Sequence, residues 1–268
     1  MLERDHVRLE VEDGIGMITL DRPEAANAQS VKVLADLDEA WTLADESPEV
    51  KVIVLRSSGR HFSAGHDMAD TDEVIARVTP VTELLYDWET RGYMAMARRW
   101  RDVPKPSIAA VQGKCIAAGL MLCWPCDLIV AADDAEFSDP VIFMGVGGGV
   151  EYHGHTWELG PRKAKEMLFT GGAVTADEAR QLGMVNHVVP RDELTDATLE
   201  LAARIARQDA FALRMAKRAV NRTLDIQGFS SAVDHCFDLH HMGHARATAL
   251  TGQPTFASHA EMKERSRS

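Results

Sequence analysis

The chain has 268 residues, of which 46% are hydrophobic and 26% are charged, and its formal net charge is −12 at pH 7. This length can bury a substantial core, as one large α/β domain or as a core domain with a smaller appendage. The negative charge argues against binding to nucleic acid or to an anionic lipid surface, although local basic side chains or helix N-termini can still hold a phosphate-bearing small ligand. No apolar run approaches membrane-spanning length, and residues 1–6 lack the order of a secretory signal, so we expect a cytosolic chain with reduced cysteines.

The first half of the chain alternates strands with turns and helices. Residues 7–11 and 17–20 alternate apolar with polar side chains on either side of Asp13-Gly14, which predicts a hairpin. Apolar residues at helical spacing predict a helix over 33–44. Further on, buried strands are expected at 51–55 and 107–111, followed by a glycine-containing turn at 113–119 and a short apolar helix.

The second half is mostly helical. Short strands are expected at 128–131 and 135–137, before a glycine-rich run at 145–149. Thr175-Ala176-Asp177-Glu178 has the form of a capping box and Gly183 suits a C-cap, so a helix is predicted between them. An extended piece over 185–189 then precedes three helices, predicted near 195–207, 210–224 and 229–248.

Three segments stand in an order that is typical of one protein family. They are Arg22-Pro23-Glu24-Ala25-Ala26-Asn27-Ala28, then Phe62-Ser63-Ala64-Gly65-His66-Asp67-Met68, then residues 105–113 running on to 126–131. By these motifs the chain resembles the enoyl-CoA hydratase/isomerase family, also called the crotonase family. The match continues through 137–140, 160–164, 168–171 and 183–186, so it covers most of the chain.

The resemblance implies an α/β fold, built as a spiral of repeated strand-strand-helix units with a helical C-terminal region for trimerisation. Residues 1–194 are then expected to form the core that binds an acyl-coenzyme A (acyl-CoA), and residues 195–268 the helical region. The expected assembly is a homotrimer or a dimer of trimers. No separate cofactor is expected, because coenzyme A enters as part of the substrate, and no metal is expected.

The family's shared chemistry is a thioester enolate, whose oxygen is held by two backbone N–H groups. By the resemblance these groups belong to His66 and Ala118. Gly65 and Gly119 permit unusual turns beside them, and helix N-termini after those turns would aim both N–H groups at one oxygen. Removing one such donor typically costs about 2.7–4 kcal/mol of transition-state stabilisation. A tight turn without catalytic role would explain either loop alone, but two in order favour the functional interpretation.

The same resemblance places the CoA part of the ligand. Residues 22–28 should line the nucleotide end of a tunnel, and the segment around residue 64 should border the pantetheine. The predicted substrate-binding residues are Arg22, Ala26, Ala28, Ala64, Gly65, Asp67, Met68 and Gly119.

The usual acid–base glutamates of the hydratases are absent. In the family one glutamate follows the glycine turn on its helix, and a second follows the proline of the next loop. Met121 and Val141 stand at these two positions. Neither side chain can transfer a proton, and because general acid–base groups contribute typically about 10²–10⁴-fold to rate, ordinary hydration should be weak.

Glu151 and His153 are the candidate substitutes, because they stand where the family has a neutral glycine-rich stretch. A histidine pKa of about 6.5 suits proton transfer at neutral pH. The alternative is that both are solvated loop residues. Nearby, His155 is assigned a structural role, and the motif leaves open where the His66 imidazole points. Aromatic and methionine residues between 67 and 105 either shape a pocket for a bulky acyl group or are simple core.

Three other signals are weaker. Cys123 and Cys126 have a C-x-x-C spacing, but they lie in the apolar turn matched by the family and are interpreted as structural. A helical face with Cys236, His240 and His244 lacks a fourth metal ligand, so subunit packing or solvent exposure explains it better. The run 145–149 has no following Gly-Lys-Ser/Thr, which argues against a nucleotide-binding P-loop.

Two hypotheses follow. The first is an enzyme, nominally an enoyl-CoA hydratase or isomerase, that uses a backbone oxyanion hole and non-standard acid–base residues. The second is a protein of the same fold that binds acyl-CoA without turnover, motivated by Met121 and Val141.

Overall fold

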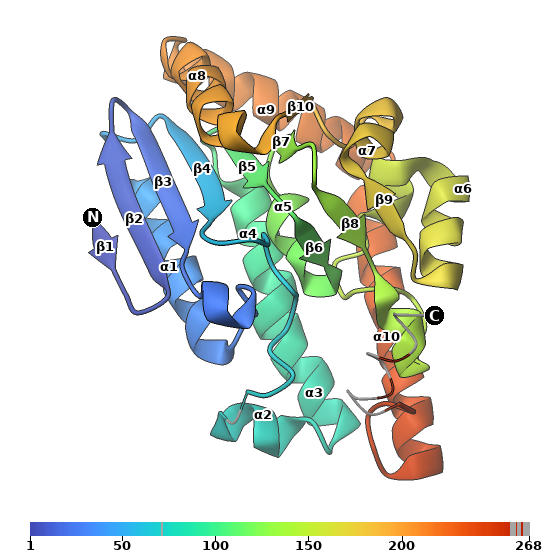
Figure 1. Cartoon of the computed structure of the whole chain (residues 1–268). Coiled ribbons are helices and arrows are strands. Elements are labelled where there is room, and N and C mark those ends of the chain that lie inside the picture. The colour runs from blue at the N-terminus through green and yellow to red at the C-terminus, as the bar shows by residue number, and fades with distance from the viewer. Residues whose placement is uncertain (71, 258–260, 262–263, 265–268) are drawn as a thin grey trace.

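A seven-stranded sheet runs through the chain in the order β1-β2-β3-β4-β5-β7-β10 (Figure 1). The predicted hairpin is confirmed, because β2 (Val7–Glu12) and β3 (Ile15–Leu20) pair antiparallel around Asp13-Gly14, with β1 (Leu2–Glu3) at the edge. The remaining strands are parallel: β4 (Val52–Ser57), β5 (Ser107–Val111), β7 (Leu128–Ala132) and β10 (His187–Val189). The computed structural model describes residues 1–70, 72–257, 261 and 264.

A smaller sheet of three strands lies beside the carboxyl ends of the large one. It consists of β6 (Lys114–Ile116), β8 (Glu136–Ser138) and β9 (Ala173–Thr175), in the order β6-β8-β9. An isolated parallel bridge between Ser63 and Cys115 ties the loop after β4 to β6. This bridge is important for the site, because it brings the second family segment against the glycine turn at 113–119.

Helices cover both faces of the large sheet. Helix α1 (Val31–Glu46) begins at Ser30, whose side chain accepts a hydrogen bond from the Val33 N–H, and it buries Leu37 and Trp41 against the first strands. Helix α8 (Leu194–Ala206) covers β4, β5 and β7 and closes a second apolar cluster on the other face. The other α-helices are α2 (Glu73–Val78), α3 (Thr82–Glu89), α4 (Ala95–Asp102), α5 (Leu120–Cys123), α6 (His155–Thr170), α7 (Ala176–Leu182), α9 (Ala210–Ile226) and α10 (Phe229–Thr251).

A single π-helical turn, η2 (Thr90–Met94), joins α3 to α4 without interrupting the long helical arm that Figure 1 shows below the sheet. Short 3₁₀ turns occur at η1 (Pro23–Ala25), η3 (Ala117–Gly119), η4 (Pro140–Met144) and η5 (Arg191–Glu193). Turns of the π type are rare and occur frequently at functional sites. Glu89 at the end of α3 is buried, as are Tyr93 and Met94 of the turn, whereas Arg91 between them is exposed.

The predicted α/β architecture with a helical C-terminal region is confirmed. The capping box at Thr175 and the Gly183 C-cap bound α7 as expected, and the last three predicted helices are α8, α9 and α10. Helix α9 has no buried residue, although it carries apolar side chains such as Phe211, Val220 and Ile226. Among the described residues, no helix has the length and apolar character that crossing a membrane requires.

Candidate functional site

The loops that contain Gly65 and Gly119 lie against each other. Gly65 has a φ of +87°, and a Cβ there would lie 2.8 Å from the Ile116 carbonyl oxygen and 3.2 Å from the Ala118 amide nitrogen. A Cβ at Gly119 would lie 2.9 Å from the Ser63 carbonyl oxygen. Both glycines are therefore required by close approach, and the backbone of His66 lies next to that of Ala118.

The two loops reach this arrangement by different routes. Gly119 has an ordinary helical φ of −58°, and η3 continues directly into α5, so a helix start follows that turn as expected. No helix start follows Gly65. Instead Gln29 and His66 form a parallel bridge, in which the Gln29 N–H donates to the Gly65 oxygen at 2.8 Å and the Asp67 N–H donates to the Gln29 oxygen at 3.0 Å. The expectation of an unusual turn at Gly119 and of a helix after Gly65 was wrong, because backbone bridging positions residue 66.

Among residues 1–70 and 72–257, neither the His66 nor the Ala118 backbone N–H donates to an acceptor outside its own helical turn. No acceptor among residues 1–70 and 72–257 takes a hydrogen bond from the His66 N–H. The Ala118 N–H belongs to the first turn of η3, where N–H groups have no partner within the helix. Two neighbouring donors of this kind can hold one oxygen that gains negative charge.

Met121, at the position of the first missing glutamate, lines a small apolar cavity. The cavity is bordered by Gln29, Leu34, His66, Tyr93, Met96, Ala97, Trp100, Met121 and Leu122. Val141 is buried in η4. The two residues offer no proton-transfer group, and the small cavity beside His66 is lined mainly by apolar side chains.

Glu151 reaches the His66 side chain. The Glu151 Oε1 atom lies 3.3 Å from the His66 Nε2 atom, and the Glu151 side chain is only 6% exposed. The His66 ring stacks on Tyr93, with ring centroids 3.9 Å apart and planes 16° from parallel. The stacking fixes the imidazole, which the sequence motif left unoriented, so that its Nε2 edge faces the carboxylate.

The Glu151 carboxyl group is held ionised. Burial raises its pKa, but the charge of His66, whose Nε2 atom contacts it, and the charge of His240 outweigh burial, so the pKa lies below its ordinary value of 4.5. The Glu151 side chain is therefore a buried carboxylate that is ionised at neutral pH. This finding excludes the alternative that Glu151 is a solvated loop residue.

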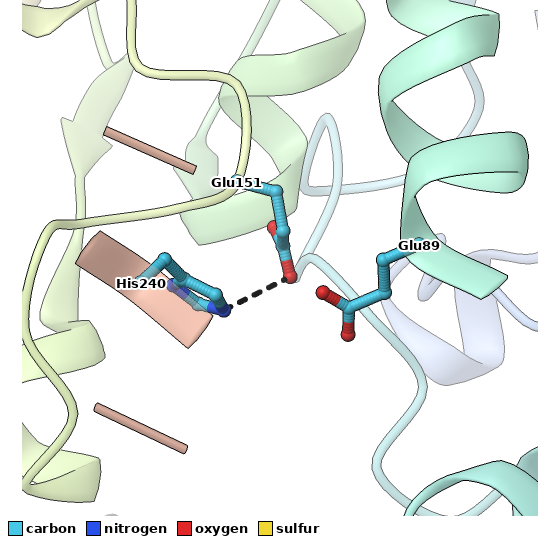
Figure 2. Close-up of side chains that lie close together, drawn as sticks. All are labelled: Glu89, Glu151 and His240. Atoms are coloured by element: carbon cyan, nitrogen blue, oxygen red, sulfur yellow. Dashed lines mark ion pairs between the residues drawn. The ribbon is translucent and has the colours of Figure 1, made fainter. Parts of the chain in front are cut away.

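Glu89 is a second buried carboxyl group close to Glu151, and the sequence analysis did not identify it. It is the last residue of α3, and its Oε2 atom lies 3.0 Å from the Nε2 atom of His241, although neither atom has hydrogen-bond geometry. Burial, and then the charge of Glu151, raise its pKa from 4.5 to about 8. Figure 2 shows the Glu89 and Glu151 side chains converging from separate elements, with His240 beside Glu151. The sequence did contain one indication of Glu89, because it is a charged residue in a helical segment rich in Met and aromatic residues.

Two histidines of α10, His240 and His244, contact each other, and His240 contacts the Glu151 carboxylate on the side away from Glu89 (Figure 2). His240 Nδ1 lies 2.7 Å from the Gly149 oxygen, His244 Nδ1 lies 2.7 Å from the Pro254 oxygen, and the two Nε2 atoms are 2.9 Å apart. A carbonyl oxygen only accepts hydrogen bonds, so both Nδ1 atoms act as donors and carry a proton. A hydrogen bond between the two Nε2 atoms would need a further proton on one of them. The Nε2 atom of His240 also lies 3.7 Å from the Oε1 atom of Glu151.

Burial, and then the charge of His240, lower the pKa of His244 to about 4. The prediction that this helical face is exposed or packs subunits was wrong for His240 and His244, which are buried in the chain itself. Oxygen and nitrogen atoms of Glu89, Glu151 and His240 lie within 4.8 Å of one another and could gather around a cation. Any test of the site therefore includes metal analysis.

His153 belongs to a different cluster. Its Nδ1 atom contacts the Gly148 oxygen at 2.9 Å and its ring lies 4.5 Å from that of His155. His155 pairs with Asp139 at 2.9 Å, both side chains being fully buried, and Asp139 also accepts hydrogen bonds from the N–H groups of Val141 and Val150. The structure does not bring His153 to His66. Its cluster braces the loop that carries Glu151, and like Glu151 it is buried rather than solvated.

The two segments predicted to bind CoA lie side by side. The Arg22 guanidinium bonds the Asp67 carboxylate at 2.6 Å, and the Ala64 N–H donates to the Ala26 oxygen at 2.9 Å. Ala28 is buried between them, whereas Met68 is half exposed. Arg22 and Met68 thus flank an accessible edge next to the bridged loop.

The cysteine pair is structural. Cys123 contacts Cys115, with Sγ atoms 3.8 Å apart, rather than Cys126. Burial raises the pKa of the Cys123 and Cys126 thiols well above the usual range, so neither is a reactive thiolate.

Comparison with known proteins identifies the family. A model of the enoyl-CoA hydratase/isomerase family matches residues 10–262. The chain belongs to the enoyl-CoA hydratase/isomerase family. Among its relatives, EchA13 of Mycobacterium tuberculosis, described as a candidate enoyl-CoA hydratase, is 42% identical over an alignment that covers 93% of this chain and 84% of that protein. The crotonyl-CoA hydratase of Syntrophomonas wolfei is 30% identical, covering 88% of this chain and 86% of that protein.

Solved structures of the family agree. A candidate enoyl-CoA hydratase from Mycobacterium smegmatis is 58% identical and superimposes with a TM-score of 0.88, covering 94% of this chain and all of that one. A second, from Mycobacterium thermoresistibile, is 58% identical with a TM-score of 0.87, covering 92% of this chain and all of that one. The fold is therefore that of the enoyl-CoA hydratase/isomerase family over nearly the whole chain.

Proposed function

We propose that this member of the family transfers protons on an enoyl-CoA or related acyl-CoA thioester, with Glu151 as the base. The observation that carries the proposal is the 3.3 Å contact between the Glu151 carboxylate and His66, whose backbone N–H is one of the two open donors. A carboxylate at this place serves the purpose of the glutamates that Met121 and Val141 replace.

The chemistry follows from the arrangement. The thioester oxygen accepts hydrogen bonds from the backbone N–H groups of His66 and Ala118, so it can take up negative charge as an enolate forms. The adjacent carbons then face Glu151, which removes a proton from carbon or from water. The acyl chain extends toward the small apolar cavity lined by Met121 and Trp100, which has to widen to admit it.

The CoA portion runs outward along the two bridged segments. Arg22 carries a positive charge at this edge, and Asp67 fixes its guanidinium. A basic side chain in this place can contact a phosphate despite the net negative charge of the chain.

We further propose that α9 packs against another copy of the chain, as a trimer or a dimer of trimers requires. Phe211, Val220 and Ile226 are between 63% and 75% exposed, and no residue of α9 is buried. A helix with such exposed apolar residues gains stability when a partner covers them.

The decisive experiment measures hydration of crotonyl-CoA, and turnover of 3-enoyl and hydroxyacyl thioesters, by the wild type, by Glu151→Gln and by Glu158→Gln. Glu158 is a control because it is a partly buried glutamate of α6, outside the cluster of Glu89, Glu151 and His240, and burial raises its pKa to about 7. We expect turnover that Glu151→Gln reduces about 10²–10⁴-fold and Glu158→Gln leaves intact. Tight acyl-CoA binding without turnover on any thioester would establish the non-catalytic alternative, and absence of binding would overturn both.

A further inference from the structure

The buried cluster of Glu89, Glu151 and His240 contains two carboxyl groups. Proton abstraction by Glu151 uses only one of them. Glu89 comes from α3, far from Glu151 in the sequence, and its side chain is 7% exposed. One carboxyl oxygen of each residue lies within 4.8 Å of the other (Figure 2). A water molecule that is hydrogen-bonded to both at about 2.8 Å fits this separation.

We propose that Glu89 is a second catalytic residue, the acid that donates a proton to the substrate while Glu151 accepts one. This inference rests on the proposed function and deepens it, because a facing acid and base fit addition of water to a 2-enoyl thioester. The pair does the work of the two glutamates absent at Met121 and Val141, from entirely different elements.

The surroundings of Glu89 explain why it keeps its proton. Glu151 faces it with a negative charge, His241 lies 3.0 Å from it, and His240 contacts Glu151 at 3.7 Å. The Glu89 Oε2 atom has no hydrogen-bond partner among the described residues. A buried carboxylate without such partners is costly, so the neutral acid is favoured.

The two pKa values support this assignment. The pKa of Glu89 is raised to about 8 and that of Glu151 is lowered, so at neutral pH one is an acid and the other a base. Environments that separate the pKa values of paired carboxyl groups are typical of acid–base catalysis. His66 and His240 lower the pKa on the Glu151 side, and burial lowers the pKa of His241 on the Glu89 side.

The proposed step is balanced. Glu151 takes one proton from the water molecule as the water oxygen bonds to the β-carbon of the substrate. The electrons of the carbon–carbon double bond move toward the thioester oxygen, which the His66 and Ala118 N–H groups hold as an enolate. The Glu89 O–H bond breaks as its proton passes to the α-carbon, and the thioester carbonyl re-forms. The product equals substrate plus water, and a proton returning from Glu151 to Glu89 through solvent resets the pair.

The test compares Glu89→Gln, Glu89→Asp and the control Glu158→Gln with the wild type, by measuring kcat, KM and the pH profile of crotonyl-CoA hydration. Glu89→Gln should lower kcat about 10²–10⁴-fold with KM within about threefold, because glutamine keeps the shape and loses the acid. Glu89→Asp should recover part of kcat. The wild-type rate should fall above a pH of about 8, as Glu89 loses its proton.

Three results would overturn the inference. If Glu89→Gln keeps the wild-type kcat and pH profile while Glu151→Gln is inactive, the proposed function stands and Glu89 is not the acid. If Glu89→Asp is no better than Glu89→Gln, the carboxyl group acts only through packing. If the purified protein contains a stoichiometric metal that Glu89→Gln and His240→Ala both lose, the cluster is a metal centre. A wild type without turnover would overturn the proposed function and this role together.

Discussion

The Nε2 atom of His66 lies 3.3 Å from the Oε1 atom of Glu151, so one histidine turns its imidazole edge to a buried carboxylate while its backbone N–H has no acceptor among the described residues. The side chain and the main chain of residue 66 thereby serve different purposes. Substitutions at this position can separate them, because the backbone N–H survives any side-chain change.

We predict that His66→Phe shifts the acidic limb of the pH–rate profile to higher pH. Phenylalanine can keep the stack on Tyr93 but removes the imidazole charge and contact that lower the pKa of Glu151. The pKa of the base should rise, and Glu151 should be protonated at a pH where the wild-type residue is ionised. Rates measured from pH 4 to pH 7 check this. An unchanged acidic limb would show that His66 does not set the charge of Glu151.

We predict that Glu89→Gln is more stable than the wild type at neutral and alkaline pH. The folded-state pKa of Glu89 is raised from 4.5 to about 8, so the unfolded chain loses this proton first as the pH rises. The wild type therefore loses stability relative to the glutamine variant, by at most about 1.4 kcal/mol for each pH unit between those two values. Denaturant unfolding at pH 5 and at pH 8 measures the difference. If the free energies of unfolding of the variant and the wild type differ by the same amount at pH 5 and at pH 8, the pKa of Glu89 is not raised.

We predict that Asp139→Asn lowers the free energy of unfolding by about 3–5 kcal/mol, the usual cost of breaking a buried pair. Asp139 bonds His155 and the N–H groups of Val141 and Val150, next to Glu151. Burial raises the Asp139 pKa, but the His155 contact and the backbone hydrogen bonds lower it by more. The stabilisation is therefore present above the unfolded pKa of about 3.9 and is lost as the pH falls through the folded value. Thermal unfolding at pH 7 checks the size, and a change below 1 kcal/mol would show that the loop does not depend on this pair.

We predict that Val220→Glu or Ile226→Glu disrupts the assembly. Both residues are exposed on α9, where a buried charge in a subunit contact would be costly. Light scattering after gel filtration should give a trimer or hexamer for the wild type and smaller species for the variants. Arg218→Glu provides a control on the same helix, because it changes charge without removing an apolar side chain. A monomeric wild type would refute the assembly.

Much of the fold could be predicted because local patterns dominate it. The Asp13-Gly14 hairpin, the capping box at Thr175 and the last three helices depend on residues close together in the chain, and each occurs where it was predicted. The family motifs likewise predicted that residues 65 and 119 meet, since both loops adjoin strands of fixed order.

The proton-transfer groups were harder to predict, because their chemistry depends on contacts between distant segments. The sequence by itself determined that Met121 and Val141 cannot transfer protons and that Glu151 is a charged residue in an otherwise apolar loop. Only the tertiary structure decided that Glu151 is an ionised partner of His66 and that Glu89 lies beside Glu151. The tertiary structure also placed His153 in a separate cluster with His155. The reason is physical: the pKa of a carboxyl group depends on burial and on charges a few ångströms away, and these are properties of packing.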